Sequence, residues 1–276
     1  MYWAGKAVTR IGLGRGELAG RVAVVTGSGR SVGRETAFAL AYLGASVVVA
    51  DMSYAGARTV DEICSAGGSS AAIRTDVSRE DHVDRLVRSA RNLFGSVDIV
   101  INTVCACDGT SMGDINAELR EQSVARSLGG VRLMCRAFLP EMLDRGSGTI
   151  VNMLSADTSS CCSAYGSVRH GLAKLNRALT AEVGEEDISI VTLPIGMVGS
   201  AREQIVSAEP LNDTGPVGDD PCAVSVHPAH DGVMPADCAG AVAAYLICKL
   251  ACEYHGEVVT GRAVLERTDL TCDNLG

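Results

Sequence analysis

The chain has no excess of positive charge. Its 276 residues carry 24 Lys and Arg against 33 Asp and Glu, which gives a formal net charge of −9. Proteins that hold nucleic-acid backbones or anionic membrane surfaces do so with basic patches, so this balance argues against both kinds of partner. Aromatic residues are also scarce, at 4%, whereas hydrophobic residues make up 47%, a composition typical of globular proteins.

Long hydrophobic runs and an export signal are missing as well. Lys6, Arg10 and Arg15 interrupt the N-terminal segment, and the longest apolar stretch, residues 36–50, is too short to cross a bilayer. We therefore expect no membrane span and a cytoplasmic location. The cysteines number 11, and an odd count without an export signal favours reduced thiols over a disulfide framework.

What the sequence does contain is an alternation of short β-branched runs with longer helical patterns. The expected strands are residues 21–26, 45–51, 70–76, 97–102, 148–154 and 188–194. The helices expected between them are residues 32–43, 54–66, 79–94, 115–143 and 163–184. The strands are nearly continuous apolar runs, which is typical of strands covered on both faces. This order predicts an α/β fold, a single Rossmann-like doubly wound parallel sheet of about seven strands with helices on both faces.

The domain organisation follows from where this alternation stops. Residues 1–18 are expected to form a loose N-terminal tail, and residues 19–276 one domain. The irregular stretch 196–236 is rich in Gly, Pro, Asp and Ser, and a long segment of this kind predicts a lid over the substrate. Residues 236–252 then resemble a helix that is apolar nearly all round, buried in the monomer or in a subunit contact. Residues 256–266 predict the seventh strand.

A glycine-rich turn, "VVTGSGRSVGRE" at residues 24–35, joins the first strand to the first helix. Such a turn lets the backbone approach a pyrophosphate, whose charge the helix N-terminus favours. Asp51 ends the second strand at the spacing of the carboxylate that binds the ribose of NAD and repels a 2′-phosphate. Arg30 could accept that phosphate, so NADP is the less favoured alternative. The cofactor-binding residues expected here are Gly27, Arg30, Ser31, Val32, Gly33, Asp51 and Met52.

This turn resembles that of the short-chain dehydrogenase/reductase family, which has the pattern TGxxxGxG. Thr26, Gly27 and Gly33 are in register with it, and Ser31 replaces the middle glycine. The resemblance extends from about residue 18 to residue 266. It implies further cofactor contacts within "TDVS", "DIVINTVC" and "ISIVTLP" at Asp76, Val77, Asn102, Val104 and Pro194.

Two further stretches, "IVNMLS" and "YGSVR", resemble the catalytic stretches of that family. Ser155 matches the catalytic serine and Tyr165 the catalytic tyrosine. Arg169 takes the place of the lysine, and Ser127, in "SLGGV", stands where the family has its proton-relay asparagine. The resemblance also implies that Tyr165 and Arg169 contact the cofactor, with Arg169 bonded to the nicotinamide ribose. The resemblance implies hydride transfer between NAD(H) and a small carbonyl or alcohol substrate, with Tyr165 as acid/base and Ser155 bonded to the substrate oxygen. Arg169 keeps the positive charge but does not readily release a proton.

Other functions stay open. Because Arg169 and Ser127 both depart from the family pattern, the chain could be a catalytically impaired dinucleotide-binding or assembly subunit of a hetero-oligomer. Ser31 and the altered "NTVC" also allow a protein that keeps the sheet and has lost the cofactor. The family resemblance implies a homodimer or homotetramer that pairs through the helices at 115–143 and 163–184.

Cysteine and histidine pairs suggest a weaker alternative. The fold is expected to bring four cysteines near the nicotinamide end, namely Cys105, Cys107, Cys161 and Cys162. Their CxC and CC spacings are poor versions of a zinc motif, so no metal is expected. His227 and His230 are interpreted as solvated residues of the lid. The sequence does not identify the substrate or the direction of the reaction.

Overall fold

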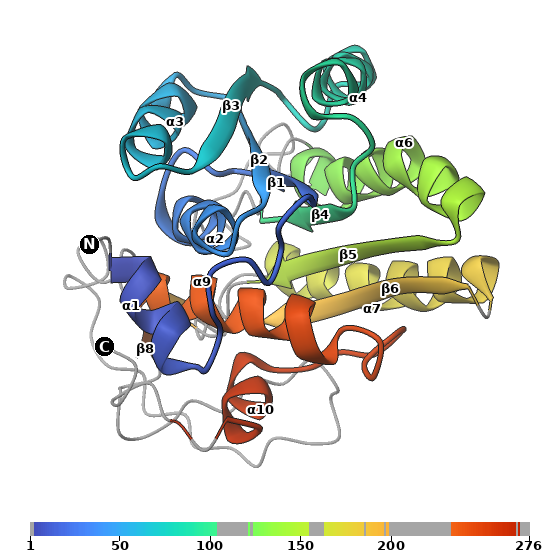
Figure 1. The fold of residues 1–276 in the computed structure, drawn as a ribbon. Helices are drawn as coiled ribbons and strands as arrows, with labels where there is room; N and C mark the ends of the chain where they lie inside the picture. Colours follow the sequence, from blue (N-terminus) through green and yellow to red (C-terminus); the bar gives the residue numbers. More distant parts are fainter. Residues whose placement is uncertain are drawn as a thin grey trace.

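A computed structural model describes residues 3–103, 121, 124–154, 163–184, 186–195, 197–198, 233–268 and 270. Six parallel strands form its main sheet, in the order β3-β2-β1-β4-β5-β6 (Figure 1). They are β1 (Val22–Thr26), β2 (Ser46–Asp51), β3 (Ser69–Arg74), β4 (Ile99–Asn102), β5 (Ser147–Leu154) and β6 (Asp187–Pro194). The predicted doubly wound parallel sheet is confirmed.

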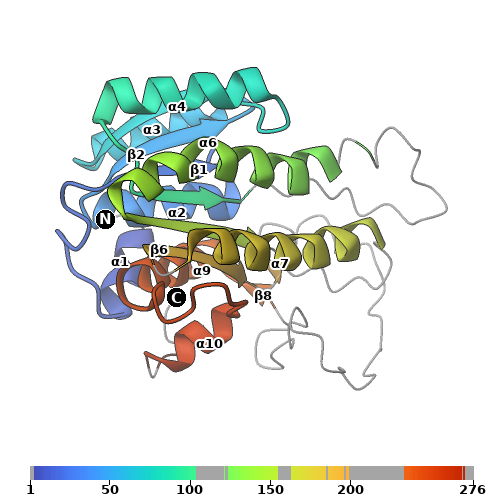
Figure 2. The same ribbon diagram turned by 90° about the vertical axis from the view of Figure 1, so that its right-hand side faces the viewer.

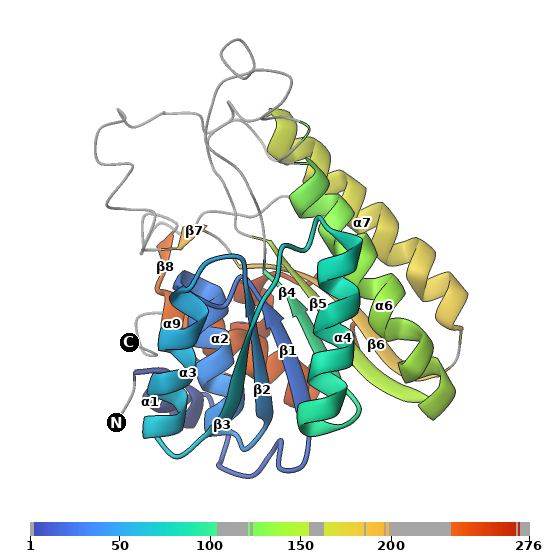
Figure 3. The same cartoon turned by 90° about the horizontal axis from the view of Figure 1, so that it is seen from above.

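Helices cover both faces of this sheet (Figure 3). One face is covered by α2 (Ser31–Tyr42), α3 (Ala55–Ser65) and α9 (Ala236–Tyr245). The other is covered by α4 (Glu80–Phe94), α6 (Gly130–Arg145) and α7 (Ser163–Val183), of which α6 and α7 lie side by side (Figures 2 and 3). Two π-helical segments, η1 (Ala125–Gly129) before α6 and η4 (Leu246–Leu250) after α9, extend these helices. Every residue of β1 is buried, as a strand between two helical layers requires.

The strand order reverses next to β1, and this reversal locates the site. The chain runs from β1 outward to β2 and β3, then returns to place β4 on the other side of β1. Helices connected to neighbouring strands diverge at such a point. They leave a crevice outside the carboxyl ends of the strands, where open α/β sheets bind ligands. The turns that follow β1 and β4 are therefore the expected ligand-binding site.

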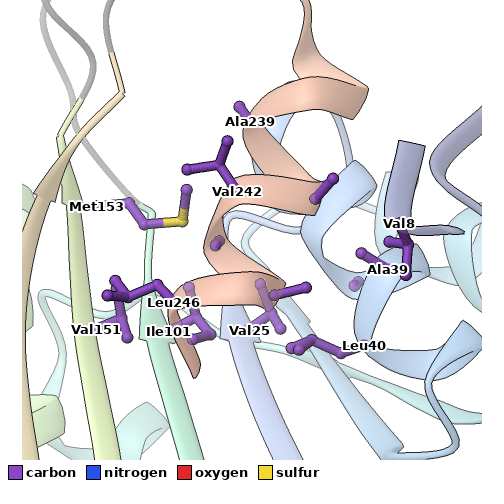
Figure 4. Close-up of a cluster of buried hydrophobic side chains, with 14 of the residues drawn as sticks. Val8, Val25, Ala39, Leu40, Ile101, Val151, Met153, Ala239, Val242 and Leu246 are labelled. Atoms are coloured by element: carbon purple, nitrogen blue, oxygen red, sulfur yellow. The ribbon is translucent and has the colours of Figure 1, made fainter. Parts of the chain in front are cut away.

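The expectation of a loose tail over residues 1–18 is wrong. Residues Trp3–Arg10 form helix α1, which packs against α2 and α9, and Val8 is fully buried near Ala39 of α2 (Figure 4). Leu13 is also buried, and the backbone N–H groups of Gly16 and Leu18 both donate to the carbonyl of Leu43 at 3.0 Å. The segment folds because α9 is apolar nearly all round and needs a second cover besides the sheet.

The seventh strand predicted at 256–266 is present only in its first part. Val258 forms a parallel bridge with Thr192 of β6, and three backbone hydrogen bonds join residues 256–259 to β6. Residues Gly261–Glu266 form helix α10, whose first turn is capped by Thr260, because its hydroxyl accepts the Ala263 N–H at 3.1 Å. The helix predicted at 236–252 corresponds to α9 and η4, and it is buried within the monomer.

The predicted lid begins and ends at a short parallel pair of strands, β7 (Met197–Val198) and β8 (Val233–Met234). This pairing brings together the two ends of the intervening chain. Residues 199–232, with His227 and His230, lie outside the described residues. Within the described ranges, no helix is both long and apolar enough to cross a membrane.

Candidate functional site

The turn after β1 has the form that a phosphate-binding turn needs. Gly27 has a positive φ of 62°, and the Ser28 hydroxyl donates to the Val25 carbonyl at 2.6 Å, which tightens the turn. Arg30 precedes α2 in an extended conformation with its side chain exposed, and Val32 is buried in the first turn of the helix. The turn thus ends at the N-terminus of a helix, where backbone N–H groups and the helix dipole favour an anion.

Gly33 is required for close packing at this turn. A Cβ added to it would lie 2.7 Å from Thr103 Oγ1 and 2.8 Å from the Gly27 carbonyl carbon, both closer than real Cβ contacts. The Thr103 hydroxyl itself donates to the Thr26 carbonyl, and the Thr103 N–H donates to Thr26 Oγ1 at 3.1 Å. The helix α2, the end of β1 and the end of β4 therefore meet at a glycine.

Ser31 adopts a conformation that suits glycine. Its φ is 50°, the one positive value found for a residue other than glycine in the described part of the chain. The left-handed region costs an ordinary L-residue about 1–2 kcal/mol relative to its usual conformations. The family's glycine pattern thus reflects a backbone requirement at this position, and the chain meets it with a strained serine.

Asp51 at the end of β2 reaches the glycine-rich turn. Its Oδ2 accepts the Gly29 N–H at 2.8 Å, and its Oδ1 accepts the N–H and the hydroxyl of Ser53 at 2.8 and 2.7 Å. A Cβ on Gly29 would lie 2.8 Å from Asp51 Oδ2, so only glycine permits this approach. A carboxylate has about four lone-pair sites, which leaves one acceptor site for a ribose hydroxyl. This remaining acceptor site fits a hydroxyl of the adenosine ribose of a dinucleotide.

A second cation lies at this end of the site. Arg74, at the end of β3, donates from Nε to the Met52 carbonyl at 3.0 Å and from a terminal nitrogen to the Tyr54 hydroxyl at 3.2 Å. Its guanidinium lies over the Tyr54 ring, 4.8 Å from the centroid. Met52 and Tyr54 are both exposed. Arg74 is opposite Asp51 in the strand register, and its guanidinium is held by the β2–α3 turn.

The predicted adenine contacts, Asp76 and Val77, lie in the loop between β3 and α4. The Ser78 N–H and hydroxyl donate to Asp76 Oδ1 at 3.0 and 2.6 Å. Burial acts to raise the pKa of Asp76, but the bonds from Ser78 and the charge of Arg126 outweigh it, so the pKa lies below its ordinary value. Val77 is buried against Gly130 at the start of α6. The loop is connected to Asp51, whose carbonyl accepts the Thr75 N–H at 2.8 Å.

The ends of β4 and β5 carry a buried pair of amides. Asn102 and Asn152 are opposite each other in the strand register, and Asn102 Nδ2 donates to Asn152 Oδ1 at 2.8 Å. Ser127 is buried in η1, and Pro194 is buried at the end of β6. Val104 lies outside the described residues. Asn102 and Pro194 end their strands at the same carboxyl edge of the sheet as Asp51.

The predicted catalytic residues Ser155, Tyr165 and Arg169 come after β5 in the sequence. Ser155 comes directly after β5 but lies outside the described residues, as do Cys105, Cys107, Cys161 and Cys162. Tyr165 and Arg169 fall on α7, one helical turn apart. Because α7 follows β5, its first turns emerge from the carboxyl edge of the sheet. Within the described ranges, no group of three or more His, Cys, Asp or Glu could hold a metal.

Some residues that build this site were not predicted, namely Gly29, Ser53, Arg74, Thr103 and His82, whose Nδ1 accepts the Asp76 N–H. Ser53 had a sequence signal, because an Asp two residues before a Ser is typical of a turn in which the carboxylate binds the backbone ahead of it. Gly29 lies inside the glycine-rich turn and could have been included with its neighbours. The roles of Arg74 and His82 depend on contacts between separate elements, which the sequence does not reveal.

The geometry agrees with comparisons to known proteins. A family model described as short chain dehydrogenase matches residues 21–210. The chain belongs to this family. It is 33% identical over 190 residues to a short chain dehydrogenase/reductase of Aspergillus oryzae, which covers 66% of this chain and 73% of the relative. It is 28% identical over 199 residues to a 3-oxoacyl-[acyl-carrier-protein] reductase of Synechocystis sp., covering 70% of this chain and 81% of the relative.

Solved structures agree with the fold of this short chain dehydrogenase. A hydroxysteroid dehydrogenase from Escherichia coli superposes with a TM-score of 0.73 at 24% identity, covering 88% of this chain and 95% of that chain. A short chain dehydrogenase from Mycobacterium avium gives a TM-score of 0.60 at 28% identity, covering 65% of this chain and 68% of that one. Members of the family are oxidoreductases that use nicotinamide dinucleotides, and the predicted family membership and oxidoreductase class are confirmed.

Proposed function

We propose that this short chain dehydrogenase transfers a hydride between NAD(H) and a small carbonyl or alcohol substrate. The observation that carries the proposal is the 2.8 Å hydrogen bond from the Gly29 N–H to Asp51 Oδ2. It holds a carboxylate against the glycine-rich turn, at the place where the family binds the adenosine end of its cofactor. The pyrophosphate would lie on Gly27 and the N-terminus of α2.

Asp51 supports NAD over NADP as the cofactor. A 2′-phosphate placed beside this carboxylate would bring two negative charges together, whereas a 2′-hydroxyl would donate a hydrogen bond to it. Arg30 and Arg74 would attract a phosphate, but Arg74 is already bonded to the Met52 carbonyl and stacked on Tyr54. Asp51 therefore favours NAD over NADP, and Arg30 and Arg74 reduce this preference.

The catalytic steps are assigned to the residues that follow β5. The bound dinucleotide supplies or accepts the hydride. Tyr165 gives its hydroxyl proton to the carbonyl oxygen in reduction and recovers it from the alcohol in oxidation, while the Ser155 hydroxyl donates to the same oxygen. Arg169, one helical turn along α7, supplies a positive charge that favours the tyrosinate. Ser127 replaces an amide in the relay, so the proton would reach Tyr165 from solvent.

Cofactor binding is tested by thermal unfolding with NADH and with NADPH. Ligand at about a hundred times its Kd stabilises a folded protein by about 2.7 kcal/mol, and we expect a shift of several degrees with NADH that exceeds the shift with NADPH. Asp51→Asn keeps an acceptor for the Gly29 N–H but removes the charge, so it should bring the two Kd values together. Equal affinities in the natural protein would contradict the role assigned to Asp51.

Turnover is tested on a panel of small carbonyls and alcohols. Tyr165→Phe should abolish it, because the proton donor is removed, whereas the Kd for NADH should rise by no more than about fivefold, the effect of one hydrogen bond to the cofactor. Should the natural protein bind NADH and show no turnover, while Arg169→Lys combined with Ser127→Asn creates it, the chain is instead a catalytically impaired dinucleotide-binding subunit. Light scattering of the same samples would test the proposed homodimer or homotetramer.

A further inference from the structure

The loop formed by residues 75–78, here called the adenine loop, is held from several sides. Thr75 is tied to the backbone of β2, the Ser78 donors bind the side chain of Asp76, and Val77 packs on Gly130. None of these contacts binds the backbone N–H of Asp76. This N–H lies beside the residue predicted to contact adenine, so the group that binds it helps to set the position of that contact.

That group is the imidazole of His82, in the first turn of α4. Its Nδ1 accepts the Asp76 N–H at 3.1 Å, and the side chain is 23% exposed. A backbone amide always donates, so Nδ1 carries no proton in this arrangement and the neutral ring has its proton on Nε2. Nε2 lies 3.9 Å from Asp81 Oδ2. His82 therefore connects α4 to the adenine loop only in its neutral form.

We propose that His82 is a positioning residue for the adenosine half of the dinucleotide site, and that its protonation weakens cofactor binding. The inference rests on the proposed function. With a proton on Nδ1, the ring and the Asp76 N–H are both donors and the bond between them is lost. The peptide that carries Asp76 and Val77 is then free to move away from the adenine, while the bonds that hold Asp51 remain.

The charges around His82 come from each element packed near it. Asp81 of α4 pairs at 3.0 Å with Arg79, the residue just before the helix, and Glu80 pairs with Arg136 of α6. Asp76 comes from the adenine loop and Arg126 from η1. Charges of both signs therefore surround the ring, and its role, which depends on the geometry of the bond to the Asp76 N–H, is tested best by replacing the ring.

The test compares two substitutions at His82 with a matched histidine elsewhere. His82→Ala removes the acceptor, and His82→Asn keeps an acceptor oxygen that can take the place of Nδ1. The control is His255→Ala. His255 Nδ1 also accepts a backbone N–H, that of Ile190, at the same distance of 3.1 Å. It lies beside β6, at the opposite edge of the sheet from β3 and the adenine loop (Figure 1).

The measurements are Tm and the Kd values for NADH, AMP and nicotinamide mononucleotide. His82→Ala should raise Kd for NADH and AMP by roughly fivefold, the effect of one net hydrogen bond, and leave nicotinamide mononucleotide unchanged. His82→Asn should restore binding. Acidification should weaken NADH binding more in the natural protein than in the Asn variant, whose acceptor oxygen takes up no proton.

The outcomes separate this inference from the proposed function. If the natural protein binds neither NADH nor AMP, both are overturned together. If it binds them and His82→Ala binds them equally well, the proposed function stands and the role of His82 is refuted. An equal loss of affinity in His255→Ala would also refute it, since that result would show a general effect of destabilisation. Should His82→Ala fail to fold, the pH profiles of the natural protein and the Asn variant decide alone.

Discussion

Replacing Gly33 with Ala tests whether the turn after β1 has the close packing on which the site depends. The new Cβ would lie 2.7 Å from Thr103 Oγ1 and 2.8 Å from the Gly27 carbonyl carbon, whereas ordinary contacts begin at 3.4 Å. Relief requires a movement of roughly 0.7 Å, and one of the two neighbours is backbone that cannot rotate away. The first turn of α2 must therefore shift away from the ends of β1 and β4.

The expected cost follows from two opposing effects. Overpacking of this kind costs about 1–3 kcal/mol, and the better helix propensity of Ala returns about 0.5–1 kcal/mol. The net loss of roughly 1–2 kcal/mol should lower Tm by about 3–6 °C in a domain of this size. The shift also moves the N-terminus of α2, so we expect Kd for NADH to rise by about tenfold or more.

Gly129→Ala is the matched control. Gly129 is also helical, with φ −62° and ψ −43°, and its added Cβ would meet nothing closer than the Val124 carbonyl oxygen at 3.8 Å. This variant should gain about 0.5–1 kcal/mol from helix propensity. Thermal unfolding followed by circular dichroism measures both variants. If Gly33→Ala is as stable as Gly129→Ala and binds NADH like the natural protein, the packing argument for this turn is refuted.

Other substitutions test the buried polar pair, the N-terminal helix and a buried carboxylate. Asn102→Ala leaves Asn152 Oδ1 without its donor and should lower the free energy of unfolding, measured in urea, by about 1–3 kcal/mol. Replacing both Asn102 and Asn152 with Leu should recover part of this loss. Val8→Ala should cost about 2 kcal/mol, whereas a loose tail would give no change. Burial raises the pKa of Glu35 although Arg34 opposes it. Stability from Glu35 is therefore lost as pH rises through that pKa, and Glu35→Gln should flatten the dependence of Tm on pH above 4.5.

The sheet was predictable from the sequence because its strands are buried on both faces. In β1, "VAVV" at residues 22–25 has no polar residue, and the apolar character of such runs identifies them as strands. The errors fall where an element depends on a distant partner. Helix α1 contains Lys6 and Arg10 and resembled a tail, yet its apolar side packs on α9, more than 200 residues away. The run at 256–266 has strand residues, but Thr260 caps a helix there.

The sequence could predict the parts of the site that depend on spacing along the chain, but not the parts that depend on contacts between separate elements. The distance along the chain from Gly33 to Asp51 is fixed by one helix and one strand, so the sequence could place the carboxylate at the turn. The strain at Ser31 was harder to foresee, since a serine is compatible with most turns and only the observed φ of 50° reveals the cost. His82 gave no signal, because its partner is a backbone amide in the preceding loop.

These observations divide the site into two halves that can be studied separately. The adenosine half is built from bonds between described residues: Gly29 to Asp51, Thr75 to the Asp51 carbonyl, and Asp76 to His82. The two departures from the family pattern that affect proton transfer, Arg169 and Ser127, belong to the nicotinamide half. Loss of a proton relay changes turnover without changing a hydrogen bond to adenosine. Cofactor affinity and turnover should therefore respond to different substitutions, and a variant that alters both equally would show that the two halves are coupled through the sheet edge.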